Sequence, residues 1–210
     1  MFGSVESGGA LAAKKIGAAR ASLGWRLKNA ARWSFVKGWI ATFLIAPFAN
    51  WWGVMTTMST LSIRLHRADG QWIDYGVVGY RVVTDAGVAY LVDDWDAGSA
   101  DINLLDFHGC GTGTTAEAAG DTALVTESTT ALNPNSTRAS GTNSQPAANQ
   151  FRTIGTATFD GSAAITEHGI FDQAATGGGT LWDRTVFSAI NVASGDSIQF
   201  TYTVTHTAGS

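Results

Sequence analysis

The residues that could carry chemistry are few and lie far apart in the sequence. The four histidines are His66, His108, His168 and His206. Nucleophilic catalysis requires a nucleophile with a base in reach and a group that orients the base, but no serine lies in a G-x-S-x-G motif. Glu167 and His168 are adjacent, and neighbours on a strand point to opposite faces, so they cannot easily act on one substrate atom. The sequence therefore predicts a non-enzyme with no catalytic residue and no cofactor.

Four closely spaced aspartates raise the possibility of a cation site: Asp93, Asp94, Asp96 and Asp101. Clustered carboxylates suit Ca²⁺, which prefers oxygen ligands. Counted from Asp94, however, the turn glycine of an EF-hand loop falls on Ser99 and its twelfth position on Leu105. We therefore predict an acidic, solvated loop and no metal site, with calcium binding as the alternative.

A glycine-rich run, GCGTGTT at 109–115, suggests a phosphate cradle, but a P-loop also requires a lysine. The sequence has no lysine after residue 57. His108 and Cys110 could share a metal, but no third ligand is near them in the sequence. As the only cysteine, Cys110 excludes an internal disulfide, and we interpret it as a small buried residue.

The elements that must position these residues are clearest in the last third, 151–207. Near its end, apolar side chains alternate with polar ones, which is typical of a half-buried strand; the apolar ones are Ile198, Phe200, Tyr202 and Val204. Turn signals cut this stretch at Asp160-Gly161, at 177–179 and at 194–196. We predict an antiparallel meander of about four strands that forms one sheet of a sandwich.

The other sheet is expected from two earlier regions. Alternating runs at 61–66 and 72–83 flank Asp69-Gly70, a strong hairpin signal, and a third strand is predicted at 88–92. Strands are also predicted at 104–108 and around 123–126. Residues 129–150 are polar and have few apolar side chains to offset the entropy of ordering, so we predict a long loop there and a candidate for subunit contacts.

Composition supports a β fold. Charged residues make up 14% of the chain, and 25 of its 210 residues are glycine, which suits short strands with many turns. The predicted fold class is all-β, an antiparallel, jelly-roll-like β-sandwich over residues 58–210. A basic, tryptophan-rich and partly helical N-terminal arm over residues 1–57 precedes it.

The arm differs sharply from the rest of the chain in charge. Residues 1–57 carry seven Lys and Arg and one Glu, a net +6, whereas the remainder carries six Arg and 16 acids, a net −10. Three interpretations of the arm stay open. In the first, residues 1–57 pack between subunits or contact nucleic acid or a membrane surface. In the second, residues 39–55 are a membrane anchor, although this stretch is short for that purpose and contains Pro47. In the third, the natural product begins at Met55 or Met58.

Three segments of the last third, ITEHGIF at 165–171, LWDRTVF at 181–187 and GDSIQFTY at 195–202, resemble β domains of phage virion structural proteins. The segment GCGTGTTAEAAGDTAL at 109–124 adds to this likeness, which covers roughly residues 104–205. The resemblance implies a capsid-associated decoration or cement protein or, as the alternative, a tail-fibre or receptor-binding module. A membrane-anchored host-side protein is a third, weaker hypothesis.

The partners implied by this resemblance are the major capsid protein or other virion proteins. We expect a homo-oligomer, with a trimer favoured, located in the virion. Exposed aromatic side chains in loops would favour the receptor-binding alternative. Trp95 and Trp182 are the candidates after residue 72, and Trp182 is expected to pack within its strand.

Glu167 and Arg184 look like site residues but have a structural explanation. They carry opposite charges and lie on strands that are predicted to be adjacent. We therefore expect a cross-strand ion pair rather than a catalytic role.

Overall fold

Strand β11 (Ser197–Thr207) lies at the centre of one sheet of this computed structural model, which describes residues 19–96, 100–129 and 137–209. It pairs antiparallel with β2 (Thr56–His66) on one side and with β8 (Gln150–Thr158) on the other. Its alternating apolar side chains are all buried: Ile198, Phe200, Tyr202 and Val204. The half-buried strand predicted from the sequence is therefore confirmed.

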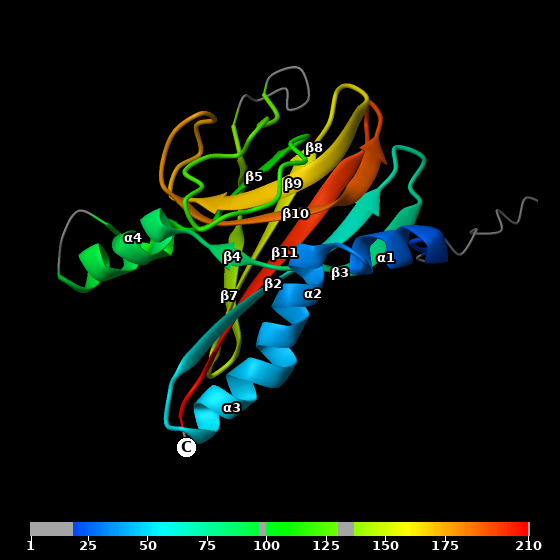
Figure 1. Ribbon diagram of the computed structural model, residues 1–210. Helices are drawn as coiled ribbons and strands as arrows, with labels where there is room; N and C mark the ends of the chain where they lie inside the picture. The colour runs from blue at the N-terminus through cyan, green and yellow to red at the C-terminus, as the bar shows by residue number, and fades with distance from the viewer. Residues whose placement is uncertain (1–18, 97–99, 130–136, 210) are drawn as a thin grey trace, which may run out of the picture.

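The strands form two sheets that pack as a sandwich (Figure 1). The six-stranded sheet has the order β1-β3-β2-β11-β8-β7, and the five-stranded sheet has the order β4-β10-β9-β5-β6. The remaining strands are β1 (Ala19–Arg20), β3 (Trp72–Tyr80), β4 (Val82–Val83), β5 (Phe107–Gly111), β6 (Ala139–Ser140), β7 (Thr142–Ala147), β9 (Ala163–Phe171) and β10 (Leu181–Val192). All pairings are antiparallel except that of β1 with β3.

The core fills the space between the sheets. Leu61, Ile63 and Leu65 of β2 belong to the same buried cluster as Phe187 and Ile190 of β10. Burying each such side chain stabilises the fold by roughly 1.5–3 kcal/mol. The predicted hairpin is also present, because β2 pairs with β3 across a turn in which Gly70 has a φ of 83°.

The last third does form four strands, β8 to β11, but they do not make one sheet. β8 and β11 belong to the six-stranded sheet, whereas β9 and β10 belong to the five-stranded sheet. The prediction of a single-sheet meander is therefore wrong. The alternation of side chains shows which face of a strand is dry, but not which sheet the strand joins.

The strand predicted at 88–92 is also wrong, because Asp85–Trp95 forms helix α4. Thr84 caps this helix, with its Oγ1 accepting a hydrogen bond from the backbone N–H of Gly87 at 2.9 Å. Apolar residues at 88, 91, 92 and 95 recur at helical spacing, and a short apolar run does not distinguish a strand from a buried helix by periodicity alone.

Two further predictions need correction between residues 102 and 150. The strand expected at 104–108 is a 3₁₀ turn, η2 (Ile102–Leu104), followed by β5, and the segment 123–126 is not a strand. The polar segment 129–150 was expected to be loop, but it carries β6 and β7. Residues 130–136 lie outside the described part of the chain.

Helix α1 (Leu23–Ala30) fastens the N-terminal arm to the sandwich. Asn29 is buried; its Nδ2 donates to the Val78 carbonyl, and its Oδ1 accepts from the Ser188 N–H, both at 2.8 Å. The indole Nε1 of Trp25 donates to the Ala189 carbonyl at 2.9 Å. The partly helical arm is thus confirmed, and α1 joins β3 to β10.

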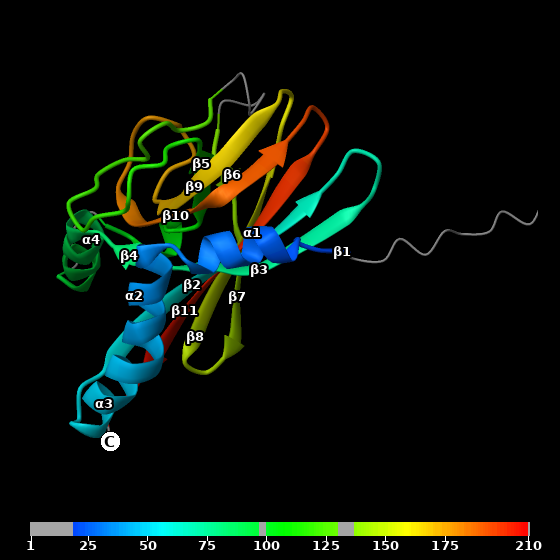
Figure 2. The ribbon, with the colours of Figure 1, turned by 45° about the vertical axis from the view of Figure 1, so that its right-hand side comes forward.

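Beyond α1, the chain continues as one rod that runs beside the lower end of β2 (Figure 2). It consists of α2 (Trp33–Ile40), a π-helical segment η1 (Ala41–Ile45) and α3 (Ala46–Trp51). Pro47 lies in the first turn of α3. A proline lacks the N–H of a regular helical bond, which accounts for the irregular π-helical turn that precedes it.

Candidate functional site

A chain of buried polar side chains runs between the sheets and is the most chemical feature of the interior. Arg81 pairs with the carboxylate of Asp183 and donates from Nη1 to Nδ1 of His168 at 2.6 Å. His168 Nε2 lies 3.0 Å from His108 Nδ1, and His108 Nε2 lies 3.3 Å from Thr153 Oγ1. Each of these side chains is buried.

The donors fix the tautomers of both histidines. A guanidinium only donates, so Nδ1 of His168 accepts and its Nε2 carries the proton. That proton is donated to Nδ1 of His108, whose Nε2–H then points to Thr153. The sequence alone does not reveal this arrangement, because the residues come from four strands and from Arg81, between β3 and β4.

The electrostatic environment of this buried row of polar side chains keeps both imidazoles neutral. Burial and then the Arg81 charge lower the pKa of His108 to about 3, and the same causes hold the pKa of His168 well below its ordinary value. Burial raises the pKa of Asp183, although the Arg81 charge opposes this shift. The enclosed groups cross-link the sheets and do not face solvent, although Nε of Arg81 has no hydrogen-bond partner.

Glu167 organises a second buried cluster on the opposite face of β9. Its carboxylate accepts backbone N–H bonds from Gly113, Val125 and Thr126 at 2.8–3.1 Å, and Arg184 donates to it from Nε and Nη2 at 3.0 and 2.8 Å. Glu167 pairs in register with Val186, so Arg184 reaches it diagonally. The predicted cross-strand pair is confirmed, and it also holds the 112–126 loop.

Arg138 forms a third cluster that the sequence did not indicate. Its Nε and Nη2 donate to the two carboxylate oxygens of Glu127 at 2.6 and 3.0 Å, and its guanidinium carbon lies 3.4 Å from the ring centroid of Phe171. Nη1 donates to the carbonyls of Gln173 and Gly178. This bidentate pair anchors the end of the polar segment beside β6.

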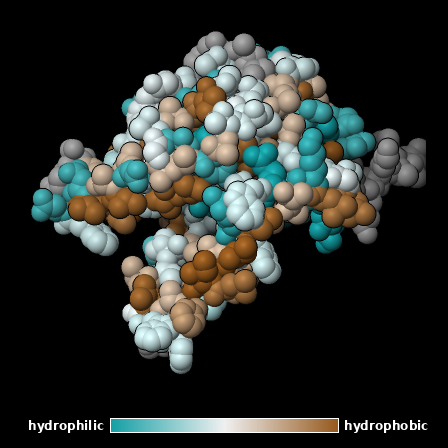
Figure 3. All heavy atoms as spheres, in the orientation of Figure 1, coloured by the Kyte–Doolittle hydropathy of each residue, from teal (hydrophilic) through white to brown (hydrophobic). Residues whose placement is uncertain are grey.

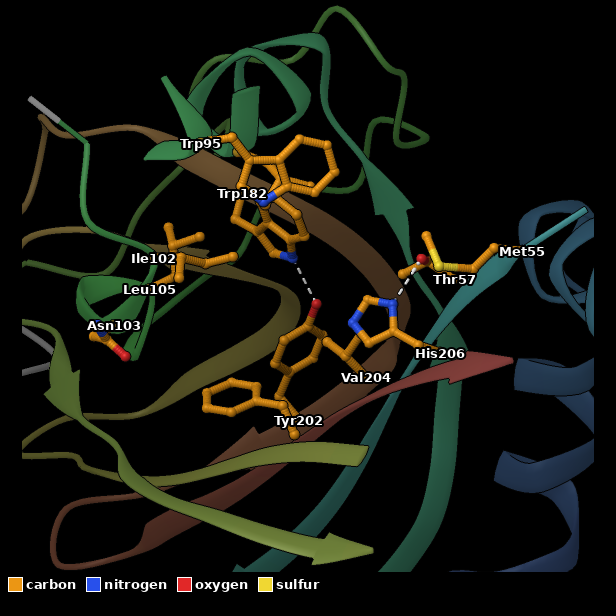
Figure 4. Close-up of a pocket in the computed structure, with 12 residues that line it drawn as sticks. Met55, Thr57, Trp95, Ile102, Asn103, Leu105, Trp182, Tyr202, Val204 and His206 are labelled. Atoms are coloured by element: carbon orange, nitrogen blue, oxygen red, sulfur yellow. Dashed lines mark hydrogen bonds between the residues drawn. The ribbon is translucent and has the colours of Figure 1, made fainter. Parts of the chain in front are cut away.

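An apolar cleft of about 390 Å³ opens between α4 and the strand ends, as Figure 4 shows. Leu91 and Trp95 of α4 line one side. The other walls come from η2, from the strands and from the segment before β2, and they include Met55, Ile102, Leu105, Phe151, Trp182, Tyr202 and Val204. Trp182 Nε1 donates to the Tyr202 hydroxyl at 2.7 Å. Trp182 is buried, as expected, whereas Trp95 is 73% exposed.

The helical rod carries many large, exposed apolar side chains. Figure 3 shows apolar surface on the rod and on α4, with a hollow between the two. The exposed apolar residues of the rod are Trp33, Trp39, Phe43, Leu44, Ile45, Phe48 and Trp51. In soluble proteins, large exposed apolar patches are typical of protein–protein contacts, membrane contacts or ligand grooves. Within the described part of the chain, no helix has both the length and the apolar content that crossing a membrane requires.

Two of the aspartates that could bind calcium accept hydrogen bonds from nearby backbone N–H groups. Asp93 Oδ2 accepts from the Ala100 N–H, and Asp94 Oδ1 accepts from the Ile102 N–H. Both lie in α4, so the expected acidic loop is in part a helix. Among residues 19–96, 100–129 and 137–209, no three His, Cys, Asp or Glu side chains come together to hold a metal.

The glycine-rich run and its cysteine belong to the interior. Gly109, Cys110 and Gly111 lie in β5, which extends beyond the strand predicted at 104–108. Cys110 is buried, and burial followed by the charges of Glu127 and Glu167 raises the pKa of its thiol to about 12. The thiol is therefore an inert core group, as interpreted from the sequence.

Comparisons with protein-family models, with curated proteins and with solved structures each found no significant match.

Proposed function

We propose that this chain is a non-enzymatic virion structural protein of a phage, most specifically a capsid-associated decoration or cement protein. It would stabilise the particle through contacts between subunits. Its partners would be the major capsid protein or other virion proteins, and it would act as a homo-oligomer, with a trimer favoured.

The observation that carries this proposal is the helical rod with its uncovered tryptophan and phenylalanine side chains. Water penalises exposed apolar area, at about 25 cal/mol per Å², so a rod of this kind is stabilised when another subunit covers it. The buried polar clusters support a scaffold role, because their charges are paired inside the body. The sequence resemblance to phage virion proteins supports the assignment of this role to a phage particle.

Quantitative gels of purified virions test the proposal. A cement protein is expected in copies comparable to those of the capsid subunit, and particles without it should resist heat or chelation less well. Absence from purified virions would contradict both this proposal and the alternative below.

The alternative is a tail-fibre or receptor-binding module that recognises a host surface. The apolar cleft with the exposed Trp95 at its edge favours it, because aromatic side chains around a cleft are typical of ligand sites. A fibre protein should be scarce in the virion, and its loss should abolish adsorption while the heads stay intact.

We also propose that the sandwich is jelly-roll-like. The pairing of its first and last long strands, β2 and β11, supports this proposal. A solved homologue with the same strand order and two Greek-key connections would test it.

A further inference from the structure

Two exposed surfaces of this molecule share apolar character, and charges of opposite sign lie beside them. The first, the arm surface, consists of the exposed apolar side chains at 39–51 on α2, η1 and α3. The arm surface itself has no charged residue, but the stretch that leads into it, residues 19–38, carries three Arg and two Lys and no acid. The second, the α4 surface, consists of Val88, Val92, Trp95, Ile102 and Leu104.

The α4 surface is strongly acidic. Five aspartates lie on α4 or just after it: Asp85, Asp93, Asp94, Asp96 and Asp101. No Lys or Arg occurs between residues 82 and 137. The apolar cleft adjoins this surface, because Leu91 and Trp95 of α4 form part of its wall.

We propose that the arm surface of one copy packs on the α4 surface of a second copy and inserts an aromatic side chain into the cleft. Apolar contact would supply affinity, and the basic arm against the acidic helix would supply orientation and specificity. One contact of this kind covers both exposed surfaces. This inference rests on the proposed structural role and identifies a second copy of this chain as the partner in that role.

A membrane explains these observations less well than a second copy does. A lipid surface would cover the arm but would leave the apolar α4 surface in water. Biological membranes often carry negative surface charge, and the acidic body would be repelled by it. The hydrogen bonds of Asn29 and Trp25 hold α1 on the sandwich, so the rod that follows starts from a fixed base.

The contact is head-to-tail, because the two surfaces are different. Such interfaces form closed rings when the rotation between copies closes, and chains when it does not. A head-to-tail contact also has a signature that a symmetric arm-to-arm contact lacks: two differently damaged copies complement each other.

Sedimentation of the full chain tests this signature. The arm variant combines Phe48→Ser with Trp51→Ser, and the α4 variant combines Val92→Ser with Trp95→Ser. Each variant should self-associate about 100-fold or more weakly than the unmodified chain, since exposed aromatic anchors dominate such contacts. Val125→Ser is the matched control, because Val92 and Val125 are 55% and 54% exposed. The Val125→Ser variant should self-associate as strongly as the unmodified chain.

The deciding measurement mixes the arm variant with the α4 variant. Each pair of unlike copies retains one intact contact, so 1:1 dimers should form with an affinity within about threefold of the unmodified contact, and longer assemblies should not. A mixture that stays monomeric, or an unmodified chain that stays monomeric, overturns the inference. Co-sedimentation of the monomer with vesicles of phosphatidylcholine and phosphatidylglycerol would point to a membrane instead. The virion copy number tests the proposed function separately from these results.

Discussion

His108 and His168 show how this protein encloses polar groups without charging them. Arg81 supplies the first donor, and each imidazole passes one hydrogen bond onward, from His168 to His108 and then to Thr153. An imidazolium has two donors and no acceptor, so protonation of either ring would leave two donors opposed. The chain of hydrogen bonds therefore requires both rings to be neutral.

The first prediction is a loss of stability on acidification. Because the folded pKa of His108 lies at about 3, below its ordinary value of 6.5, the unfolded chain binds a proton that the folded chain does not. The contribution of His108 to stability is complete above about pH 6.5 and is lost progressively as the pH falls toward 3. At pH 5 the share of His108 in this loss should be roughly 2 kcal/mol. The lowered pKa of His168 adds to the loss that urea unfolding measures.

His108→Gln separates this effect from that of Asp183, whose own pKa is raised. The variant should be less stable at pH 8, yet it should lose roughly 2 kcal/mol less than the unmodified chain between pH 8 and pH 5. His206→Gln, at an exposed position, should keep the original pH dependence. An unchanged dependence in His108→Gln would show that His108 is not held neutral.

The second prediction concerns Glu167. Glu167→Gln leaves the buried Arg184 paired only with the partly exposed Asp121, 2.9 Å from its Nη1, and puts an amide where three backbone N–H groups donate. Breaking a buried pair typically costs about 3–5 kcal/mol, and chemical unfolding should show a loss of that size. Arg64→Gln, which removes an exposed pair with Asp74 at 4.0 Å, should cost less than about 1 kcal/mol.

The sequence predicted one of these buried pairs and missed the others for a physical reason. Glu167 and Arg184 lie on strands joined by a single recognisable turn, so their neighbourhood follows from local pattern. Arg81 and Asp183 are 102 residues apart in the sequence, and only the pairing of β4 with the distant strand β10 brings them together. No periodic pattern encodes such a contact.

Among the elements, α4 is held against the sandwich by close backbone approach. A Cβ at Gly87 would clash with the carbonyl of Trp182 in β10, whereas a Cβ at Gly24 in α1 would meet nothing within 4 Å. The same substitution at these two helical glycines is therefore expected to have opposite effects.

Gly87→Ala should destabilise the protein by about 1–3 kcal/mol, the usual cost of overpacking. Gly24→Ala should stabilise it by about 0.5–1 kcal/mol, because alanine loses less entropy in a helix. Urea unfolding of both variants measures the difference. Equal effects at the two positions would contradict the packing of α4 on β10.

The arm depends on Asn29. Asn29→Ala would leave the buried Val78 carbonyl and Ser188 N–H without their partner, at a cost of about 1–3 kcal/mol. Hydrogen exchange of α1 and α2 should accelerate while that of β11 stays slow. Asn143→Ala, at an exposed position, is the control and should leave exchange in the arm unchanged.

Strand prediction succeeded where one face of a strand is wet. The sheet of a strand could not be predicted where both faces are dry, and a short apolar run did not separate strand from helix. β2 and β11 alternate cleanly and were located correctly. β10 is buried at nearly every position, so its pattern does not show to which sheet it belongs. For α4, a five-residue apolar run was compatible with either structure, and the capping by Thr84 decided for the helix.

For the whole molecule, the separation of charge is the property that bears on assembly. A basic arm and an acidic body attract each other between copies, and salt screens this attraction. Self-association should therefore weaken severalfold between 50 mM and 500 mM NaCl, as measured by sedimentation. A contact that strengthens over this range would indicate that apolar packing alone carries it.

The pairing of β2 with β11 has a mechanical consequence. Thr56 pairs with Thr207 at one end of this ladder, and His66 pairs with Ser197 at the other. A force that pulls Thr56 away from Thr207 would open the ladder one pair at a time, like a zipper, rather than shear all its bonds at once. A force applied to the rod also acts on α1, and the hydrogen bonds of α1 to β3 and β10 bear part of that force. Resistance to pulling on the rod should therefore depend on the attachment of α1 as well as on the long ladder.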